Sequence, residues 1–349
     1  MSGRPAGALP AQPRAHRVVN ILLLGFGNVG RAFAKMVLRK KSELSEATDG
    51  LEIRVIGIST GSHGFAYDVG GVDLAACLAL ATADSSRDWQ FASGEYGPQM
   101  DMSFTDEMLS RACEDTGLGM DLVIDAVLEC ITTPDHSTGE PALSYLMKAT
   151  ESLGCHIVTA SKGPVLHGFR SLAKAAERQG KRFLFESSVM DGVPVFSFAR
   201  AMMPGCAQIL GFDGILNSTT NIVLTEMEAT QCSYADALAK AQRDGIAERE
   251  PSLDIDGHDA AIKVAILATV LLGGGEPITL AEVDISAAGI GAVTLDDINA
   301  AARRGARLKV VCSGRKVRDR RRTTVVRTTV AFRANPAHNL TRPPLPIWP

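Results

Sequence analysis

The sequence lacks any closely spaced pair of cysteines. Its seven cysteines are scattered singly along 349 residues, which excludes a CxxC metal or redox pair. The odd count also argues against a secreted disulfide framework. We therefore expect reduced thiols in a cytoplasmic protein.

An excess of one charge and a long apolar run are missing as well. The formal net charge is −3, with 36 basic and 39 acidic residues, so the overall balance favours neither nucleic acid nor an anionic membrane as a partner. No apolar run reaches the ~18–20 residues that cross a bilayer, and the longest, at 264–272, predicts a buried helix. Residues 1–17 lack the apolar core of a secretory signal. We expect a disordered leader there, with an organelle transit peptide as the alternative because acids are absent.

The first half of the chain alternates short apolar strands with helical segments. Residues 18–24 are almost continuously apolar, as in a parallel strand covered on both faces. The predicted segments are strands at 18–24, 52–59, 122–126 and 156–160, and helices at 31–38 and 141–153. This alternation is typical of βαβ units and a parallel sheet. It predicts an α/β fold with an N-terminal Rossmann dinucleotide-binding domain at 18–164.

After residue 164 the pattern becomes that of an α+β domain. Strands are predicted at 183–186 and 209–215, and helices at 233–243 and 257–272. We interpret residues 165–311 as a catalytic and dimerisation domain. Residues 312–349 are basic and contain several prolines, and we predict that they form an atypical tail outside this domain.

A G-x-G-x-x-G motif follows the first strand and opens the first helix, which is the context that dinucleotide binding requires. Gly25 would make the tight turn, Gly27 would let the backbone approach the pyrophosphate, and Gly30 would let helix and strand pack closely. The helix N-terminus would offer free N–H groups and a positive dipole end to the phosphates. The predicted cofactor-binding residues of this loop are Gly25, Phe26, Gly27, Asn28, Val29 and Gly30. The alternative is a turn that binds nothing.

The end of the second strand lacks the Asp or Glu that would bond the ribose 2′-hydroxyl of NAD. Ser59 and Thr60 stand there as predicted cofactor contacts, followed by Gly61, Ser62 and His63. Because no carboxylate would repel a 2′-phosphate, NADP is the predicted cofactor. No arginine follows closely, so NAD stays open.

Residues 245–263 gather five carboxylates and one lysine around a turn that contains proline and glycine. Asp259 and Lys263 are four residues apart and share one face of the predicted helix, with Asp259 at the start, where the helix dipole favours an anion. Apolar neighbours would lower the pKa of Lys263 unless Asp259 holds it charged. Such a lysine can shuttle a proton near neutral pH. An ordinary salt bridge on a solvated face is the alternative.

The motif G-x-x-E-x-x-P-x-x-D-x-x-G-x-D-A-x-x-K at 245–263 resembles the signature of homoserine dehydrogenases. Segments that agree in the right order lie at 25–33, 139–149, 156–164, 183–195 and 214–227, so the resemblance covers about residues 18–310. It implies NAD(P)-dependent interconversion of L-homoserine and L-aspartate 4-semialdehyde in threonine, methionine and isoleucine biosynthesis. It also implies a homodimer formed through the second domain.

The resemblance assigns roles to individual residues. Lys263 would be the general acid/base at the substrate oxygen, while Glu248, Asp254 and Asp259 would bind and orient the amino acid. Lys162 would touch cofactor and substrate at the nicotinamide end. The remaining implied contacts are Asn217 and Thr219 on the substrate side, and Thr132 at the nicotinamide ring.

The loop at 186–193 resembles the monovalent-cation site of the same family. There Glu186 and the backbone carbonyls of Val189, Asp191 and Val193 would hold sodium. A plain turn before the next helix, stabilised by Gly192 and Pro194, is an equal alternative.

Past residue 311 the family pattern is no longer recognisable, which predicts that the cofactor domain has lost an edge element. An active dehydrogenase is the leading interpretation, and a truncated, weakly active or inactive NADP(H)-binding relative is the alternative. Another oxidoreductase of the same plan, such as aspartate-semialdehyde dehydrogenase, would need a cysteine nucleophile with a nearby base. None of the seven cysteines has a distinctive setting in the sequence.

Overall fold

The computed structural model describes residues 17–48, 50–83, 89–91, 103–117, 122–131, 137–202, 208–248, 250–272, 277–285, 289–318 and 324–336. The chain forms two compact units. The first comprises Met1–Pro164 and Ser171–Phe185, and the second comprises Val165–Arg170 and Glu186–Pro349. The domain boundary that we predict after residue 164 therefore falls inside one helix, whose segments are shared by the two units.

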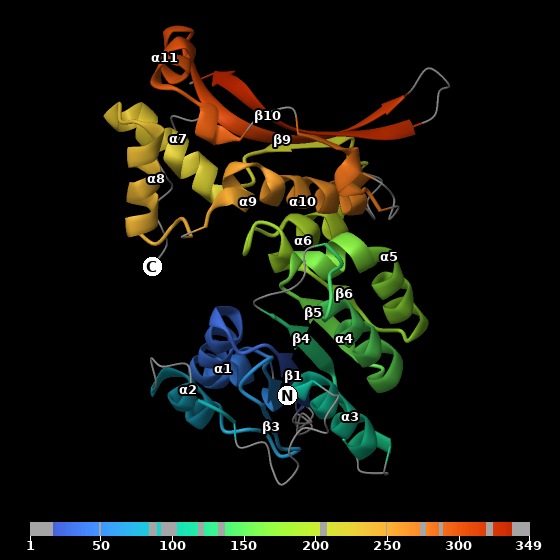
Figure 1. The fold of residues 1–349 in the computed structure, drawn as a ribbon. Coiled ribbons are helices and arrows are strands. Elements are labelled where there is room, and N and C mark those ends of the chain that lie inside the picture. Colours follow the sequence, from blue (N-terminus) through green and yellow to red (C-terminus); the bar gives the residue numbers. More distant parts are fainter. Residues whose placement is uncertain are drawn as a thin grey trace, which may run out of the picture. The chain divides into compact units, whose positions relative to one another are not determined.

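The first unit is built on a six-stranded sheet with the order β3-β2-β1-β4-β5-β6 (Figure 1). Its strands are β1 (Arg17–Leu24), β2 (Leu51–Ser59), β3 (Phe65–Tyr67), β4 (Ala126–Glu129), β5 (His156–Thr159) and β6 (Phe183–Leu184). Neighbouring strands are parallel except β3, which pairs antiparallel with β2. The predicted Rossmann domain of an α/β fold is confirmed, with an antiparallel edge strand that the sequence pattern did not indicate.

Helices cover both faces of this sheet. They are α1 (Asn28–Ala47), α2 (Leu74–Ala83), α3 (Phe104–Gly117), α4 (Ala142–Lys148) with the π-helical turn η1 (Ala149–Leu153), and α5 (Lys162–Arg178). Alternate residues of β1 enter different cores: Leu22 and Leu24 pack with α3 and α4, whereas Leu23 packs with α1 and α2. This two-sided burial explains why β1 is almost continuously apolar.

The third predicted strand lies too early in the chain. We expect a strand at 122–126, whereas β4 spans Ala126–Glu129 and pairs Ala126 with Ile21 and Glu129 with Leu24. The apolar pattern is misleading because β4 ends on a glutamate that is fully buried. A charged residue is normally a sign that the strand has already ended.

The second unit contains a four-stranded mixed sheet with the order β7-β9-β10-β8. The strands are β7 (Gly211–Gly214), β8 (Val283–Ile285), β9 (Ala306–Arg318) and β10 (Thr324–Pro336). Its helices are α6 (Val195–Met202), α7 (Ser218–Thr230), α8 (Tyr234–Arg243), α9 (Ser252–Ile255), α10 (His258–Leu267) with the π-helical turn η4 (Ala268–Leu272), and α11 (Leu295–Arg303). Short 3-10 turns complete it at η2 (Glu186–Ser188), η5 (Leu280–Glu282) and η6 (Ile290–Ala292).

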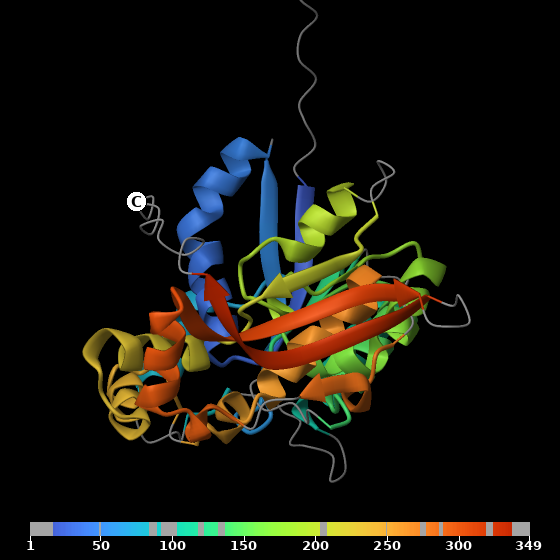
Figure 2. The ribbon, with the colours of Figure 1, turned by 90° about the horizontal axis from the view of Figure 1, so that it is seen from above.

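The prediction of a tail outside the fold from residue 312 is wrong for residues 312–318 and 324–336. β9 runs on to Arg318, and β10 pairs with it antiparallel from Thr324 to Pro336, so that the two form a long ribbon (Figure 2). β10 also pairs with β8 in parallel. The physical reason is that Thr, Val and Phe, which are frequent in β10, are good strand formers, although the arginines among them suggest a basic tail.

The apolar stretch that ends at Leu272 forms a buried helix, as predicted. The apolar residues of α10 are all buried, and η4 continues the helix into the core. Among the described residues, no helix combines the length and the apolar character that a membrane span would need.

Candidate functional site

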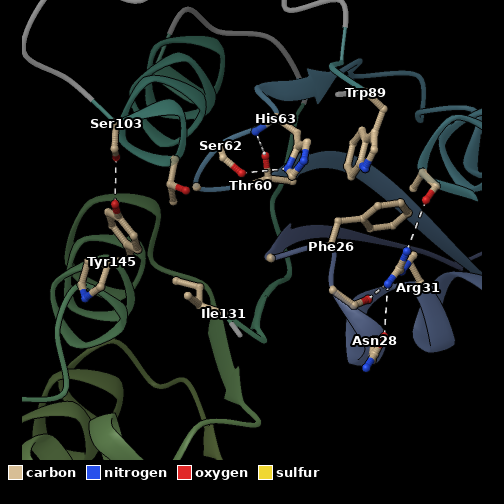
Figure 3. A pocket seen from close by; sticks show the side chains of 16 residues that line it. Phe26, Asn28, Arg31, Thr60, Ser62, His63, Trp89, Ser103, Ile131 and Tyr145 are labelled. Atoms are coloured by element: carbon tan, nitrogen blue, oxygen red, sulfur yellow. Dashed lines mark hydrogen bonds between the residues drawn. The ribbon is translucent and has the colours of Figure 1, made fainter. Parts of the chain in front are cut away.

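The first unit contains a cavity of about 740 Å³ at the carboxyl ends of its central strands. In doubly wound sheets this is the edge where ligands bind. It is lined by Gly25, Phe26, Gly27, Asn28, Arg31, Thr60, Gly61, Ser62, His63, Ala81, Trp89, Ser103, Thr105, Ile131, Pro141 and Tyr145 (Figure 3). We refer to it as the dinucleotide pocket.

The glycine loop fits a phosphate cradle. Gly25 has a φ of +98°, and a Cβ there would lie 2.5 Å from the carbonyl oxygen of Cys130. A Cβ on Gly30 would lie 2.4 Å from the carbonyl oxygen of Gly25. At the start of α1, Gly27 provides no side-chain cap and the first turn holds no acid. The N–H groups of that turn are therefore available to an anion such as a pyrophosphate.

Arg31 ties the loop to the neighbouring helix. Its guanidinium donates to the carbonyl oxygens of Gly27 and Ala81, each at 3.3 Å, and to Oδ1 of Asn28 at 3.1 Å. Figure 3 shows these bonds at the wall of the pocket. A positive charge is thus held beside the phosphate loop.

The end of β2 forms a second wall. The imidazole of His63 stacks on Trp89, with ring centroids 4.1 Å apart and planes 10° from parallel (Figure 3). The Ser62 hydroxyl lies 2.9 Å from Nδ1 of His63. Thr60 shapes the turn by donating to the carbonyl oxygen of Gly64 and accepting from the N–H of His63. Among the described residues, no carboxylate lines this part of the pocket.

The predicted cofactor contacts divide into two groups. Gly25, Phe26, Gly27, Asn28 and Thr60 line the pocket, whereas Val29, Gly30, Ser59 and Lys162 are not among its lining residues. Val29 is 50% exposed. Gly30 is buried against Gly25. The Ser59 hydroxyl is buried against that of Thr105.

Lys162 and Thr132 are the residues predicted to contact the nicotinamide. Lys162 is the first residue of α5, and Ser161 is its N-cap residue. Thr132 lies outside the described residues.

The second unit brings the predicted lysine and its carboxylate together. Nζ of Lys263 lies 2.7 Å from Oδ2 of Asp259, and the two side chains are only 16% and 15% exposed. The same ammonium donates to the carbonyl oxygen of Leu216 at 2.9 Å. Asp259 lies in the first turn of α10, as predicted. This pair is therefore not an ordinary surface salt bridge, since both side chains are largely buried.

Asn217 joins this ion pair to a second carboxylate. Its amide nitrogen donates to Asp254 Oδ1 at 2.7 Å and to Asp259 Oδ2 at 3.1 Å. The hydroxyl of Thr219 donates to Asp254 Oδ2 at 2.7 Å. Asn217 Oδ1 in turn accepts from the N–H of Thr220 and thereby caps α7. We call Asn217, Thr219, Asp254, Asp259 and Lys263 the lysine network.

Glu248 stands apart from the lysine network. It is exposed, and its backbone carbonyl accepts a bond from Gln242 at 3.1 Å. Among the described residues, its carboxylate makes none of the bonds that hold the network together. Its role in binding an amino acid stays a prediction.

At the predicted sodium loop, the carboxylate of Glu186 is bonded by the protein itself. Glu186 accepts from the N–H groups of Phe196 at 2.8 Å and Ser197 at 2.9 Å, and pairs with Arg200 at 3.3 Å. Both carboxylate oxygens thus bond the start of α6. Met190 and Asp191 adopt left-handed backbone angles in the turn. These contacts favour the plain turn, and the sodium set (Glu186, Val189, Asp191 and Val193) stays a prediction. Among the described residues, no group of three or more His, Cys, Asp or Glu side chains could hold a metal ion.

Comparisons with known proteins agree on one family. A family model described as homoserine dehydrogenase matches residues 194–342. The NAD(+)-dependent homoserine dehydrogenase of Pseudomonas canavaninivorans is 35% identical over 292 residues, which are 83% of this chain and 76% of that protein. The chain belongs to the homoserine dehydrogenase family. The enzyme of that name from Methanocaldococcus jannaschii is 31% identical, over 84% of this chain and 80% of its own.

Solved structures of the family share the fold. A putative homoserine dehydrogenase from Archaeoglobus fulgidus matches with a TM-score of 0.71 and 26% identity, over 92% of this chain and 85% of that one. The homoserine dehydrogenase of Thiobacillus denitrificans matches with a TM-score of 0.68 and 27% identity, over 93% of this chain and 63% of that one. Because the family model extends to residue 342, residues 312–342, which we expected to depart from the family, match it.

The homoserine dehydrogenase resemblance did not reveal every residue that lines or supports these regions. Arg31 follows the last motif glycine and could have been found from that position alone. The stacking of His63 on Trp89 had no such signal, because the two residues are 26 positions apart and no pattern links them. Asn217 was expected on the substrate side, but its bonds to two carboxylates needed the structure.

Proposed function

We propose that this chain catalyses the NAD(P)-dependent interconversion of L-homoserine and L-aspartate 4-semialdehyde, and so serves threonine, methionine and isoleucine biosynthesis. The observation that carries the proposal is the lysine network, in which a largely buried ammonium is ion-paired with Asp259 at 2.7 Å. Carboxylates are the natural partners of an amino-acid ammonium group. A charged lysine is the natural partner of an oxygen that gains or loses a proton.

Each member of the lysine network has a place in this chemistry. In reduction of the aldehyde, protonated Lys263 would polarise the carbonyl oxygen and give it a proton. In oxidation of homoserine, the same nitrogen would take the proton of the hydroxyl group. Asp259 would hold Lys263 in position, and Asp254 and Glu248 would bind the substrate ammonium. Asn217 and Thr219 would orient the carboxylates, which they already bond.

Two features of the dinucleotide pocket support binding of a nicotinamide cofactor. The glycines of the loop allow close backbone contacts, and the N-terminus of α1 has no side-chain cap and can bind phosphates. When bound, the cofactor accepts or supplies the hydride. The protein residues hold it: the glycine loop and Arg31 at the pyrophosphate, and Lys162 and Thr132 at the nicotinamide end.

NADP is the cofactor preference that we propose. Among the described residues that line the pocket, the segment after β2 contributes Ser62 and His63 and no carboxylate. A hydroxyl and an imidazole can both donate hydrogen bonds to a 2′-phosphate. The relative from Pseudomonas canavaninivorans is named NAD(+)-dependent, so NAD is the cofactor to compare against.

We also infer a homodimer in the cytoplasm. Large apolar side chains of the second unit are exposed, among them Phe198 and Leu210 at 64% each. Such surfaces favour association. Light scattering of the purified chain tests the dimer, and a monomer at micromolar concentration would contradict it.

The test is turnover of the purified full chain with L-homoserine and NADP+, followed by NADPH absorbance. Lys263→Ala should lower kcat by about 10²- to 10⁴-fold, the usual contribution of a general acid/base. It should leave NADP+ binding intact, because Lys263 belongs to the second unit.

Lys240→Ala is the matched control. Lys240 also pairs with an aspartate four residues away, Asp244 at 3.1 Å, but on an exposed helix face. Its loss should leave kcat unchanged. Cofactor binding by the wild type without turnover would overturn the proposal in favour of an inactive relative, and activity that requires phosphate and a thiol would indicate an aspartate-semialdehyde dehydrogenase reaction.

A further inference from the structure

A fully buried carboxylate ends the central strand β4. Glu129 is 0% exposed, and none of the ion pairs formed within the described part of the chain involves it. Burying a carboxylate is costly unless hydrogen bonds replace its water. An apolar residue would fill this position more cheaply. The bonds that Glu129 makes must therefore account for its presence.

Three neutral donors from two neighbouring strand ends converge on this carboxylate. Oε1 accepts from the N–H of Ile131 at 2.7 Å and from the hydroxyl of Ser161 at 2.9 Å. Oε2 accepts from the hydroxyl of Thr159, and Thr159 Oγ1 accepts in turn from the N–H of Ser161 at 3.0 Å. One side chain thus joins the loop after β4, the end of β5 and the N-cap residue of α5.

The joined segments border the proposed nicotinamide end. Ile131 lines the dinucleotide pocket, and Cys130 before it donates to the carbonyl oxygen of Leu24, at the start of the glycine loop. Ser161 is followed directly by Lys162, the first residue of α5. A shift of the Glu129 carboxylate would therefore move Ile131 directly and Lys162 through Ser161.

We propose that Glu129 is a positioning residue for the dehydrogenase reaction, which fixes the loop after β4 and the start of α5 around the nicotinamide. The proposal rests on the proposed function, because Lys162 is placed at the nicotinamide by that assignment. Burial raises the pKa of Glu129, and the donated hydrogen bonds act against this rise. Such opposing effects on the pKa are expected of a carboxylate whose role is to accept hydrogen bonds and not to pair with a positive charge.

Three variants separate geometry from stability. Glu129→Gln keeps the side-chain length and one acceptor oxygen, but replaces the second acceptor with a donor. Glu129→Asp keeps both acceptors but withdraws them by one methylene. Asp125→Asn is the matched control, because Asp125 precedes the same strand and its Oδ2 also accepts a backbone N–H across to β1, from Asn20 at 2.8 Å. It lies at the opposite edge of the sheet from the pocket.

The measurements are kcat, the Kd for NADPH and the emission of bound NADPH, which reports the surroundings of the nicotinamide without turnover. Glu129→Gln should lower kcat about tenfold, as one lost hydrogen bond does. Glu129→Asp should lower it by about 10²-fold, because misplacing a reacting group by 1 Å costs that much. Both should keep the Kd within about threefold, since the phosphate loop is untouched, while the emission of bound NADPH shifts toward that of free NADPH.

Glu129→Gln keeps the proposal testable if Glu129→Asp does not fold. A wild-type kcat together with wild-type emission in Glu129→Gln overturns the proposal. So does a kcat loss that Asp125→Asn reproduces, because the effect would then be one of stability. A wild type that binds NADPH but does not turn over overturns the proposed function alone, and the emission of bound NADPH in the variants then decides the role of Glu129.

Discussion

The dinucleotide pocket is formed mainly by backbone groups, whereas the lysine network is formed by side chains. The pocket is shaped by backbone: Gly25 and Gly30 have no room for a Cβ, and the N–H groups of α1 face it without a cap. The network is shaped by side chains: Asn217 bridges two carboxylates, one of which holds Lys263. The two regions should therefore fail in different ways when single side chains are changed.

This difference follows from the ligands that each region would bind. A pyrophosphate presents oxygens that backbone N–H groups and a helix dipole can bind at close range. An amino acid that must lose or gain a proton needs titratable side chains at fixed positions. Backbone recognition tolerates no added atom, whereas a side-chain network tolerates isosteric changes and responds to lost charge.

The largest effect is expected for Gly25→Ala. The left-handed φ of +98° costs an alanine roughly 1–2 kcal/mol. In addition, its Cβ would lie 2.5 Å from the Cys130 oxygen, so the loop after β4 must move. We expect NADP+ binding to weaken by at least about 10²-fold, or the first unit to unfold, because overpacking adds about 1–3 kcal/mol. Fluorescence titration and thermal melting measure the two outcomes.

Gly50→Ala is the control for backbone strain. Gly50 has nearly the same φ, +94°, but no atom lies within 4 Å of the added Cβ. It should lose only about 1 kcal/mol of stability and keep its cofactor affinity. Equal losses in both variants would mean that the left-handed angle, and not the close approach of the backbone, makes Gly25 necessary.

The next largest effect is expected for Asn217→Ala. It removes the cap of α7, worth about 1 kcal/mol. It also takes the amide donor from Oδ1 of Asp254 and one of two donors from Oδ2 of Asp259, which keeps Lys263. Each such loss costs about 1–3 kcal/mol. We expect lower stability and a kcat reduced by about tenfold or more, since Asp259 loses a bond that orients it. Urea unfolding and steady-state kinetics measure both.

Ser233→Ala separates the two roles of Asn217. Ser233 caps α8 by accepting the N–H of Asp236 at 3.2 Å, far from any member of the lysine network in the sequence. It should lose about 1 kcal/mol of stability with an unchanged kcat. If Asn217→Ala behaved in the same way, the lysine network would be only a structural feature.

A smaller effect is expected for Ser62→Asp, because the pocket is lined by side chains after β2. Ser62→Asp would put a carboxylate beside the proposed 2′-phosphate position, at the end of β2 where NAD-binding folds carry an acid. The ratio of kcat/KM for NADP+ to that for NAD+ should fall about tenfold or more, since one like-charge contact costs about 1 kcal/mol or more. Ser62→Asn has the same size without the charge and should leave the ratio within about threefold. An unchanged ratio in Ser62→Asp would place the 2′-hydroxyl elsewhere.

The two regions also differ in how far sequence alone could predict them. The glycine motif follows a strand and opens a helix, so its place in the fold is set by local pattern, and β1, α1 and β2 lie where we expected them. Lys263 and Asp259 were paired by helical spacing, which is also local. Glu129 could not be found, because its burial depends on hydroxyls about 30 residues away in the chain. The strand β10 could not be predicted either, because its basic sequence forms a strand by pairing with β8 and β9.

The smallest effect is expected from the thiols, which are buried in both regions. Cys130 donates to the carbonyl oxygen of Gly25 at 3.1 Å behind the phosphate loop, and Cys312 is buried in β9. Burial raises the pKa of Cys130 and Cys155 to about 12 and that of Cys312 to about 11. At neutral pH these groups are un-ionised, and a thiol nucleophile needs the thiolate. A cysteine-dependent mechanism therefore has no support from these three residues.

Peptide mapping after iodoacetamide treatment of the native chain at about pH 8 checks this expectation, with the partly exposed Cys232 as the internal control. Cys130, Cys155 and Cys312 should label only after denaturation, and turnover should survive. Stability should respond to alkali instead. Because an unfolded thiol ionises near pH 9 and the folded ones do not, the stability from the neutral thiols is present below about pH 9 and is lost as the pH rises toward 11 or 12. Rapid native labelling of Cys130 or Cys312 with loss of turnover would instead reopen the thiol-dependent reaction class.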